Sequence, residues 1–182
     1  MICQYEYYRP ILTSLTYLGS LIGFFIIPHI ADNWGRKPAL RISWSFFVLG
    51  ALCLCLCDSP NMTGLGFFFS GFGSNPAVTL SYSLINEQCI GRRRQYYLVA
   101  VQILFAVGEC VIGLLFLPGY SWRYVFYLMF GCVLMLLFFS DYVLESPKFL
   151  ISKSKKKTLD VLNKIATINK RKPLLLEDVE KI

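Results

Sequence analysis

The sequence predicts an all-α, polytopic membrane helix bundle, and two observations carry that prediction. Hydrophobic residues make up 55% of the 182-residue chain and charged residues only 16%, whereas a soluble domain carries about a quarter charged residues. The charges also cluster between long apolar stretches, as a bilayer requires, because a charge at mid-membrane costs about 2.5–3.5 kcal/mol. The net charge of +7 therefore indicates membrane topology signals, and no nucleic acid partner is expected.

Five segments are long enough to cross the hydrocarbon core, which needs about 20 predominantly apolar residues in a helix. Backbone groups in lipid must be satisfied within the segment, so each one is expected to be helical. Residues 1–9 precede these spans and residues 145–182 follow them. The predicted spans are Pro10–Ala31, Ala39–Cys57, Thr63–Ile85, Tyr96–Leu117 and Trp122–Leu144.

The basic residues of the short links predict the orientation of the chain. Short loops rich in lysine and arginine stay on the cytoplasmic side. The links after the first and third spans carry Arg36, Lys37, Arg41 and Arg92–Arg94, whereas the other side has only Arg9 and Arg123. The segment before the first span is therefore expected outside, and residues 145–182 are expected in the cytoplasm.

Small residues in the first and third spans predict close helix packing. Gly19 and Gly23 form a GxxxG pattern, which lets a second helix backbone approach closely. Glycines crowd the start of the third span, and Pro76 follows in its middle, where it is expected to kink the helix. Plain close packing and a flexible helix lining a moving cavity both remain open.

The region after Leu144 changes character and predicts a short amphipathic helix. Apolar residues recur at helical spacing at Leu159, Leu162, Ile165 and Ala166. Such a helix is expected to lie on the membrane face or on the helix ends. The basic run Lys153–Lys157 suits anionic lipid headgroups, and a solvated basic loop is an equal alternative.

The link after the first span holds charges that have two interpretations. Asp32 ends one predicted helix, Gly35 suits a tight turn, and Arg36 and Lys37 begin the next helix. Opposite charges at helix ends pair across a closed interface and separate when it opens. The alternative is that Arg36 and Lys37 are only cytoplasmic anchors.

Three motifs, which follow one another along nearly the whole chain in the family's order, resemble those of the major facilitator superfamily. Asp32, Gly35, Arg36 and Lys37 match the loop motif G-x-x-x-D-R-x-G-R-R/K, with Pro28 and Asn33 as departures. The string from Glu145 to Leu150 resembles the P-E-S-P-R-(F/W)-L sequence that follows the sixth helix, with Leu144 and Lys148 as departures. Glu87 and Arg92–Arg94 resemble the charges that flank the fourth-to-fifth helix link.

The amino-acid sequence of these motifs is most similar to that of the organic cation/anion transporters, with the sugar porters as the close alternative. By this resemblance the chain is a partial N-terminal half, helices two to six, of a twelve-helix carrier. It would move small organic solutes, organic ions or sugars, by alternating access between two helix bundles. The resemblance implies a cytoplasmic charge network that gates the carrier, formed by Asp32, Gly35, Arg36, Lys37, Glu87, Arg93, Glu145 and Lys148.

A partial carrier is expected to need either its missing helices or a partner membrane subunit. The second hypothesis is a non-transporting membrane subunit or scaffold that retains the fold, which the departures from the motifs favour. The lipid bilayer is the expected surrounding, and the plasma membrane is favoured over an organelle. No enzymatic activity and no cofactor or metal are expected, because the sequence has no phosphate-binding loop and its one histidine has no evident catalytic partner.

Polar residues deep in two spans mark a candidate substrate path. Glu109 lies past the middle of its span, and an intramembrane carboxylate usually faces a partner or a wet cavity. Gln102 lies seven residues earlier, on the same helix face, and Asn75 and Tyr82 repeat that spacing in the third span. A carboxylate there would suit a cation or a proton. The alternative is that Glu109 is a buried structural acid.

Overall fold

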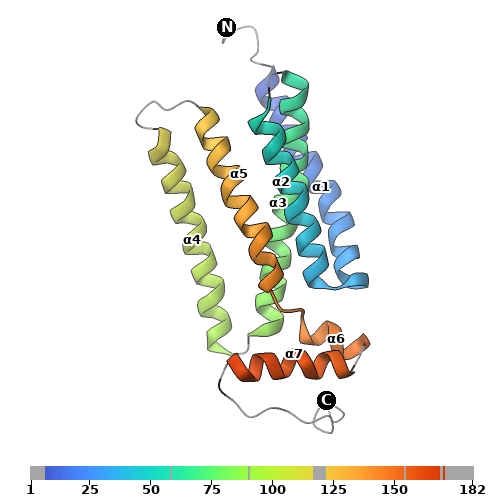
Figure 1. The fold of residues 1–182 in the computed structure, drawn as a ribbon. Helices are drawn as coiled ribbons and strands as arrows, with labels where there is room; N and C mark the ends of the chain where they lie inside the picture. Colours follow the sequence, from blue (N-terminus) through green and yellow to red (C-terminus); the bar gives the residue numbers. More distant parts are fainter. Residues whose placement is uncertain are drawn as a thin grey trace.

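A computed structural model describes residues 7–57, 59–89, 91–116, 122–153, 155–168 and 170. All regular secondary structure in these residues is helical, which confirms the predicted fold class. Five long helices run side by side, and two short ones lie across one end of the bundle (Figure 1). The helices are α1 (Tyr8–Trp34), α2 (Arg36–Cys55), α3 (Pro60–Gln88), α4 (Arg92–Phe116), α5 (Trp122–Phe139), the 3-10 turn η2 (Ser140–Tyr142), α6 (Pro147–Lys153) and α7 (Lys155–Ile168).

Each expected span coincides with one long helix, and the bounds differ at the ends. Helix α3 begins earlier than expected because Ser59 caps it, its hydroxyl accepting a hydrogen bond from the Met62 amide at 3.4 Å. Helix α5 ends at Phe139, before the expected Leu144. Residues 143–146 are non-helical, in keeping with the restriction that Pro147 places on the residue before it. Helix α7 covers the segment of the expected amphipathic helix.

Four of the five long helices are apolar enough by length and composition to cross a membrane, where the sequence predicted five. Within the described chain these are α1, α2, α4 over Arg92–Leu114, and Arg123–Tyr142. Helix α3 is not among them, although its 29 residues span about 43 Å at 1.5 Å per residue. Its glycine, serine and asparagine residues lower its hydropathy; the glycines and Ser70 are buried where α3 packs between α1 and α2, whereas the asparagines are exposed. Its role as a span remains a prediction.

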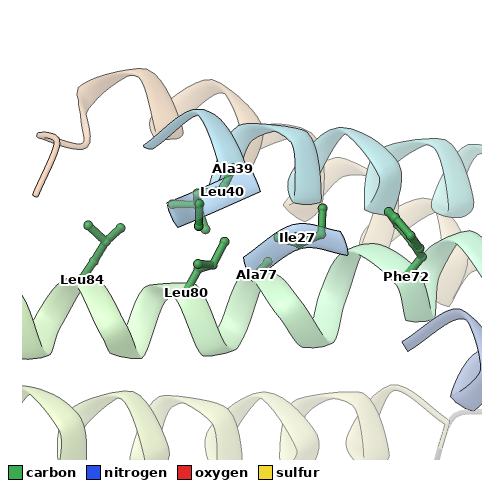
Figure 2. Packing of buried hydrophobic residues seen from close by; sticks show 8 residues of the cluster. Ile27, Ala39, Leu40, Phe72, Ala77, Leu80 and Leu84 are labelled. Carbon is green, nitrogen blue, oxygen red and sulfur yellow. The ribbon is translucent and has the colours of Figure 1, made fainter. Parts of the chain in front are cut away.

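The buried core lies where α3 meets α1 and α2. Figure 2 shows Ile27 of α1 and Leu40 of α2 above the α3 residues Phe72, Ala77 and Leu80. Ile27 and Ala77 are fully buried. This dry contact holds α1, α2 and α3 together as one packed unit.

Glycines allow these three helices to touch backbone to backbone. A Cβ on Gly19 would lie 2.1 Å from the Phe68 carbonyl oxygen, and one on Gly71 would lie 2.1 Å from the Thr16 oxygen. A Cβ on Gly73 would lie 2.5 Å from the Ser43 oxygen of α2. The close approach expected from the glycine pattern is therefore present at both α3 seams, and α3 continues as a helix through Pro76.

Helix α4 stands apart from that unit. Its described side chains are exposed, except Leu98 and Val101, which are half-buried. It approaches α3 near their shared turn and diverges from it toward the far end of the bundle (Figure 1).

Candidate functional site

Most of the charged residues predicted to act together lie around the turn between α1 and α2. Gly35 forms this turn with a φ of +113°, a backbone conformation that is open essentially to glycine alone. Its amide donates to the Ala31 carbonyl at 3.1 Å and so ends α1. A Cβ at this position would lie 2.6 Å from Oε2 of Glu145. The turn therefore requires glycine both for its backbone angles and for the space that Glu145 occupies.

Glu145 accepts hydrogen bonds from the first amides of α2. Its Oε1 accepts from the Arg36 amide at 2.8 Å and from the Lys37 amide at 3.1 Å. A carboxylate at this position satisfies amides that have no partner within the helix, and it complements the positive end of the helix dipole. A residue from beyond α5 thus caps a helix more than a hundred positions earlier.

The side chain of Arg36 bridges two carboxylates from different helices. Its Nη1 lies 2.7 Å from Oδ1 of Asp32 in α1, and its Nη2 lies 3.5 Å from Oε1 of Glu87 in α3. The side chains of Arg36 and Glu87 are 21% and 15% exposed, whereas that of Asp32 is 68% exposed. The Asp32 contact is thus the shorter of the two, whereas the Glu87 contact is the one that water screens less.

A second set of contacts surrounds Arg36 and Glu145. Lys37 donates its ammonium group to the Asp141 carbonyl, and Arg41, one turn further along α2, forms an ion pair with the Asp141 carboxylate. Gln88 donates to the Leu144 carbonyl at 3.0 Å. These contacts attach residues 141–145 to the ends of α2 and α3. We call Asp32, Gly35, Arg36, Lys37, Glu87, Asp141 and Glu145 the helix-end cluster.

Two of the predicted network residues lie outside the helix-end cluster. Arg93 and Lys148 are exposed, and neither contacts the cluster in the part of the chain that the structure describes. Asn33, which departs from the motif, turns back along α1, and its amide group donates to the His29 carbonyl at 2.9 Å. It contributes no charge to the cluster.

The sequence did not predict three residues that form contacts at this end of the bundle, namely Asp141, Arg41 and Lys153. Asp141 pairs with Arg41, and Lys153 of α6 donates its ammonium group to the Asn33 carbonyl. Lys37 and Arg41 are one helical turn apart and so share a face, which is a signal that could have pointed to a common acid. Lys153 carries no comparable signal, because its partner is a backbone carbonyl.

The candidate substrate path is only partly brought together. Tyr82 of α3 and Gln102 of α4 line one shallow groove of about 410 Å³ together with Asn86, Leu98 and Val99. Asn75, two turns from Tyr82, donates its amide group to the Ser20 hydroxyl of α1 at 2.6 Å. Glu109, two turns beyond Gln102, is exposed, so it is not a buried acid within this chain.

The described residues bring no three His, Cys, Asp or Glu side chains into an arrangement that could hold a metal ion. The described residues instead show close helix packing and charges grouped at one end of the bundle. Fold and site together define a multi-pass integral membrane protein built of helices.

Comparison with known proteins identifies the family. The model of the Major Facilitator Superfamily matches residues 10–176, and the chain belongs to this superfamily. The chain is 30% identical over 156 residues to the 4-hydroxybenzoate transporter PcaK of Acinetobacter baylyi, covering 81% of this chain and 34% of that protein. It is 29% identical over 171 residues to the organic cation/carnitine transporter 6 of Arabidopsis thaliana, covering 90% of this chain and 32% of that protein.

The fold also matches a solved transporter. The xylose transporter XylE of E. coli, in a partially occluded inward-open conformation, aligns with a TM-score of 0.75 and 18% identity, covering 93% of this chain and 47% of that one. The chain spans about a third of the length of the curated relatives named above.

Proposed function

We propose that this chain forms the greater part of one helix bundle of a solute carrier that moves small organic solutes across a membrane by alternating access. The observation that carries the proposal is the helix-end cluster, in which one carboxylate, Glu145, joins the segment after α5 to the start of α2. Membership of a transporter superfamily agrees with this role and with the absence of an enzymatic one.

The geometry suits a gate because its contacts link separate helices at one end only. Arg36 connects α1 to α3, and Glu145 connects α2 to the segment after α5. The exposed pair of Arg41 with Asp141 contributes only about 0–1 kcal/mol, and the hydrogen bonds of Glu145 about 1.5–3 kcal/mol each, so the cluster can open at a cost below that of unfolding the packed helices. In this proposal the cluster holds one end of the carrier closed on the cytoplasmic side. Arg93 and Lys148 would join it only when the rest of the carrier is in place.

The substrates of the relatives define the solute classes worth testing. Their names include an aromatic acid, an organic cation with carnitine, and a sugar. Tyr82, Gln102, Asn75 and Glu109 are the residues that we propose to lie along the solute path. The missing helices of the full carrier, or a partner membrane subunit, would complete that path.

Uptake by the full-length gene product in proteoliposomes tests the proposal. Radiolabelled 4-hydroxybenzoate, tetraethylammonium and xylose represent the three classes. Saturable uptake of any one above empty liposomes supports a carrier. A folded protein that takes up none of these classes or of a wider solute panel, and that co-purifies with a larger membrane complex, would instead establish the scaffold alternative, which the departure at Asn33 favours.

Cellular location is a further part of the proposal. We propose residence in the plasma membrane, with the helix-end cluster in the cytoplasm. Surface biotinylation of intact cells tests the first statement. A cysteine placed at Arg93 tests the second, since a membrane-impermeant thiol reagent should label it only after the cells are opened.

A further inference from the structure

One face of α3 is polar although the structure leaves it uncovered. Asn75, Thr79 and Asn86 are exposed and Tyr82 is half-exposed, and their spacing places them on one side of the helix. The opposite sides of α3 pack against α1 and α2. The exposed surface of α3 between Asn75 and Asn86 is therefore largely polar, with Val78 as its exposed apolar residue.

Lipid is a poor partner for such a face. Other uncovered surfaces of the bundle are apolar, as Phe25 of α1 and Leu104 of α4 illustrate, at 75% and 70% exposure. Polar side chains at membrane depth are costly unless they face the bundle interior or a wet cavity. The polar face of α3 accordingly fits an aqueous path better than the bilayer.

The groove between α3 and α4 shows how the two helices are aligned. The two helices run antiparallel from their shared turn (Figure 1), and Tyr82 and Gln102 both line the groove, as do Asn86, Leu98 and Val99. Asn75 lies seven residues before Tyr82 on α3, and Glu109 lies seven residues after Gln102 on α4. Each is therefore about 10 Å further from the shared turn along its helix. Seven residues preserve the helix face. Asn75 and Glu109 thus lie at one depth, on sides of α3 and α4 that continue the groove, where the helices diverge (Figure 1).

The groups on these two faces are rich in hydrogen-bond acceptors. The Asn75 amide nitrogen is held by the Ser20 hydroxyl at 2.6 Å, and no donor among the described residues reaches its carbonyl oxygen. Ser20 is itself fixed, because its hydroxyl lies 3.1 Å from the Gly71 carbonyl and 2.9 Å from the Thr16 carbonyl. The Thr79 hydroxyl donates to the Asn75 backbone carbonyl at 3.2 Å and keeps free lone pairs. Glu109 adds a carboxylate.

We propose that Glu109 is a binding residue for a positive charge on the path between α3 and α4, with Asn75 as the positioned acceptor opposite. The charge comes either from a cationic group of the solute or from a proton taken up by the carboxylate. This inference rests on the proposed function and deepens it, because it assigns the charge of what the path binds.

Binding and uptake by the full-length protein in proteoliposomes test the inference. The variants are Glu109→Gln, Glu109→Asp and, as the control, Asp160→Asn, which removes an exposed carboxylate from α7. If the solute supplies the charge, Glu109→Gln lowers the affinity for tetraethylammonium at least tenfold. Glu109→Asp restores part of it, and Asp160→Asn stays within twofold of the parent.

If a proton taken up by Glu109 supplies the charge instead, the same variants are expected to give a different result. Tetraethylammonium affinity then stays unchanged, while Glu109→Gln abolishes the dependence of solute uptake on a pH gradient. Infrared spectra of the reconstituted protein provide a readout separate from transport, since the carboxyl band that forms on acidification is reduced in Glu109→Gln.

The inference is overturned if the parent protein transports a solute and Glu109→Gln keeps the same affinity, pH dependence and carboxyl band. That result would leave the proposed function intact. A parent protein that moves no solute of the panel would instead contradict the proposed function, and the infrared comparison would then still decide whether Glu109 takes up a proton or interacts with tetraethylammonium.

Discussion

Among glycine-to-alanine substitutions at the ends of helices, Gly35→Ala should lower the free energy of unfolding of the bundle the most. An alanine at a φ of +113° is strained by about 1–3 kcal/mol. The added Cβ would also lie 2.6 Å from Oε2 of Glu145, so the carboxylate must shift, which weakens its hydrogen bonds to the amides of Arg36 and Lys37. Loss of a charge-assisted hydrogen bond costs about 1.5–3 kcal/mol. The backbone strain and the loss of one such bond together predict a decrease of about 2.5–6 kcal/mol in the free energy of unfolding.

The matched control is Gly91→Ala. Gly91 also has a positive φ, of +68°, but nothing lies within 4 Å of a Cβ there. It should lose only the backbone contribution of about 1–2 kcal/mol. Denaturant-induced unfolding of the full-length protein in detergent micelles, followed by tryptophan fluorescence, measures both variants.

A double-mutant cycle separates the two contributions at Gly35. Glu145→Ala removes both the obstacle to the Cβ and the hydrogen bonds, so Gly35→Ala should then cost only its backbone strain. The combined variant should therefore lose about 1.5–3 kcal/mol less than the two single losses added together. Strict additivity would refute the structural reason given for glycine at this turn.

Three further perturbations distinguish packing contacts from charge contacts. Gly19→Ala, whose Cβ would lie 2.1 Å from a backbone oxygen of α3, should lower thermal stability by about 1–3 kcal/mol, whereas Gly108→Ala, with open space around it, should be neutral or stabilising by up to about 1 kcal/mol. Lys153→Met should speed hydrogen exchange in α6 severalfold, because it removes the contact with the end of α1; an equal effect of Lys148→Met, which lacks that contact, would contradict this. Glu87→Gln should cost about 1–2 kcal/mol, and an unchanged denaturation midpoint would show that its ion pair contributes nothing.

The helices were predictable because lipid leaves the backbone little choice. Every amide in a membrane span must find its partner within the segment, so long apolar runs could be assigned without knowing their neighbours. The packing at Gly19 was predictable for a related reason, since only the smallest residues let two helix backbones touch. Composition alone was less reliable for α3, where buried glycines serve the contacts with α1 and α2 and polar residues such as Thr79 and Asn86 are exposed.

The charge contacts were only half predictable. The residues around Gly35 lie within a short motif, so their proximity followed from the sequence. Asp141 meets Arg41 only because α5 gives way to a 3-10 turn at Ser140, an irregularity that periodicity does not encode. That Tyr82 and Gln102 line one groove likewise depends on where α3 and α4 approach each other, which the sequence pattern of each helix leaves undetermined.

The two kinds of contact divide the bundle into parts with different freedom. The seams of α3 with α1 and α2 are dry and set by backbone contact, so separating them would expose core residues such as Ile27 and Ala77 and lose packing over their whole length. The helix-end cluster lies near water, and residues 140–153 are attached in part by exposed ion pairs that water can replace and in part by apolar contact, since Val143 packs against the core and Leu150 is buried. A conformational change of this chain should therefore move the segment from Ser140 to Lys153 and leave α1, α2 and α3 as one rigid unit.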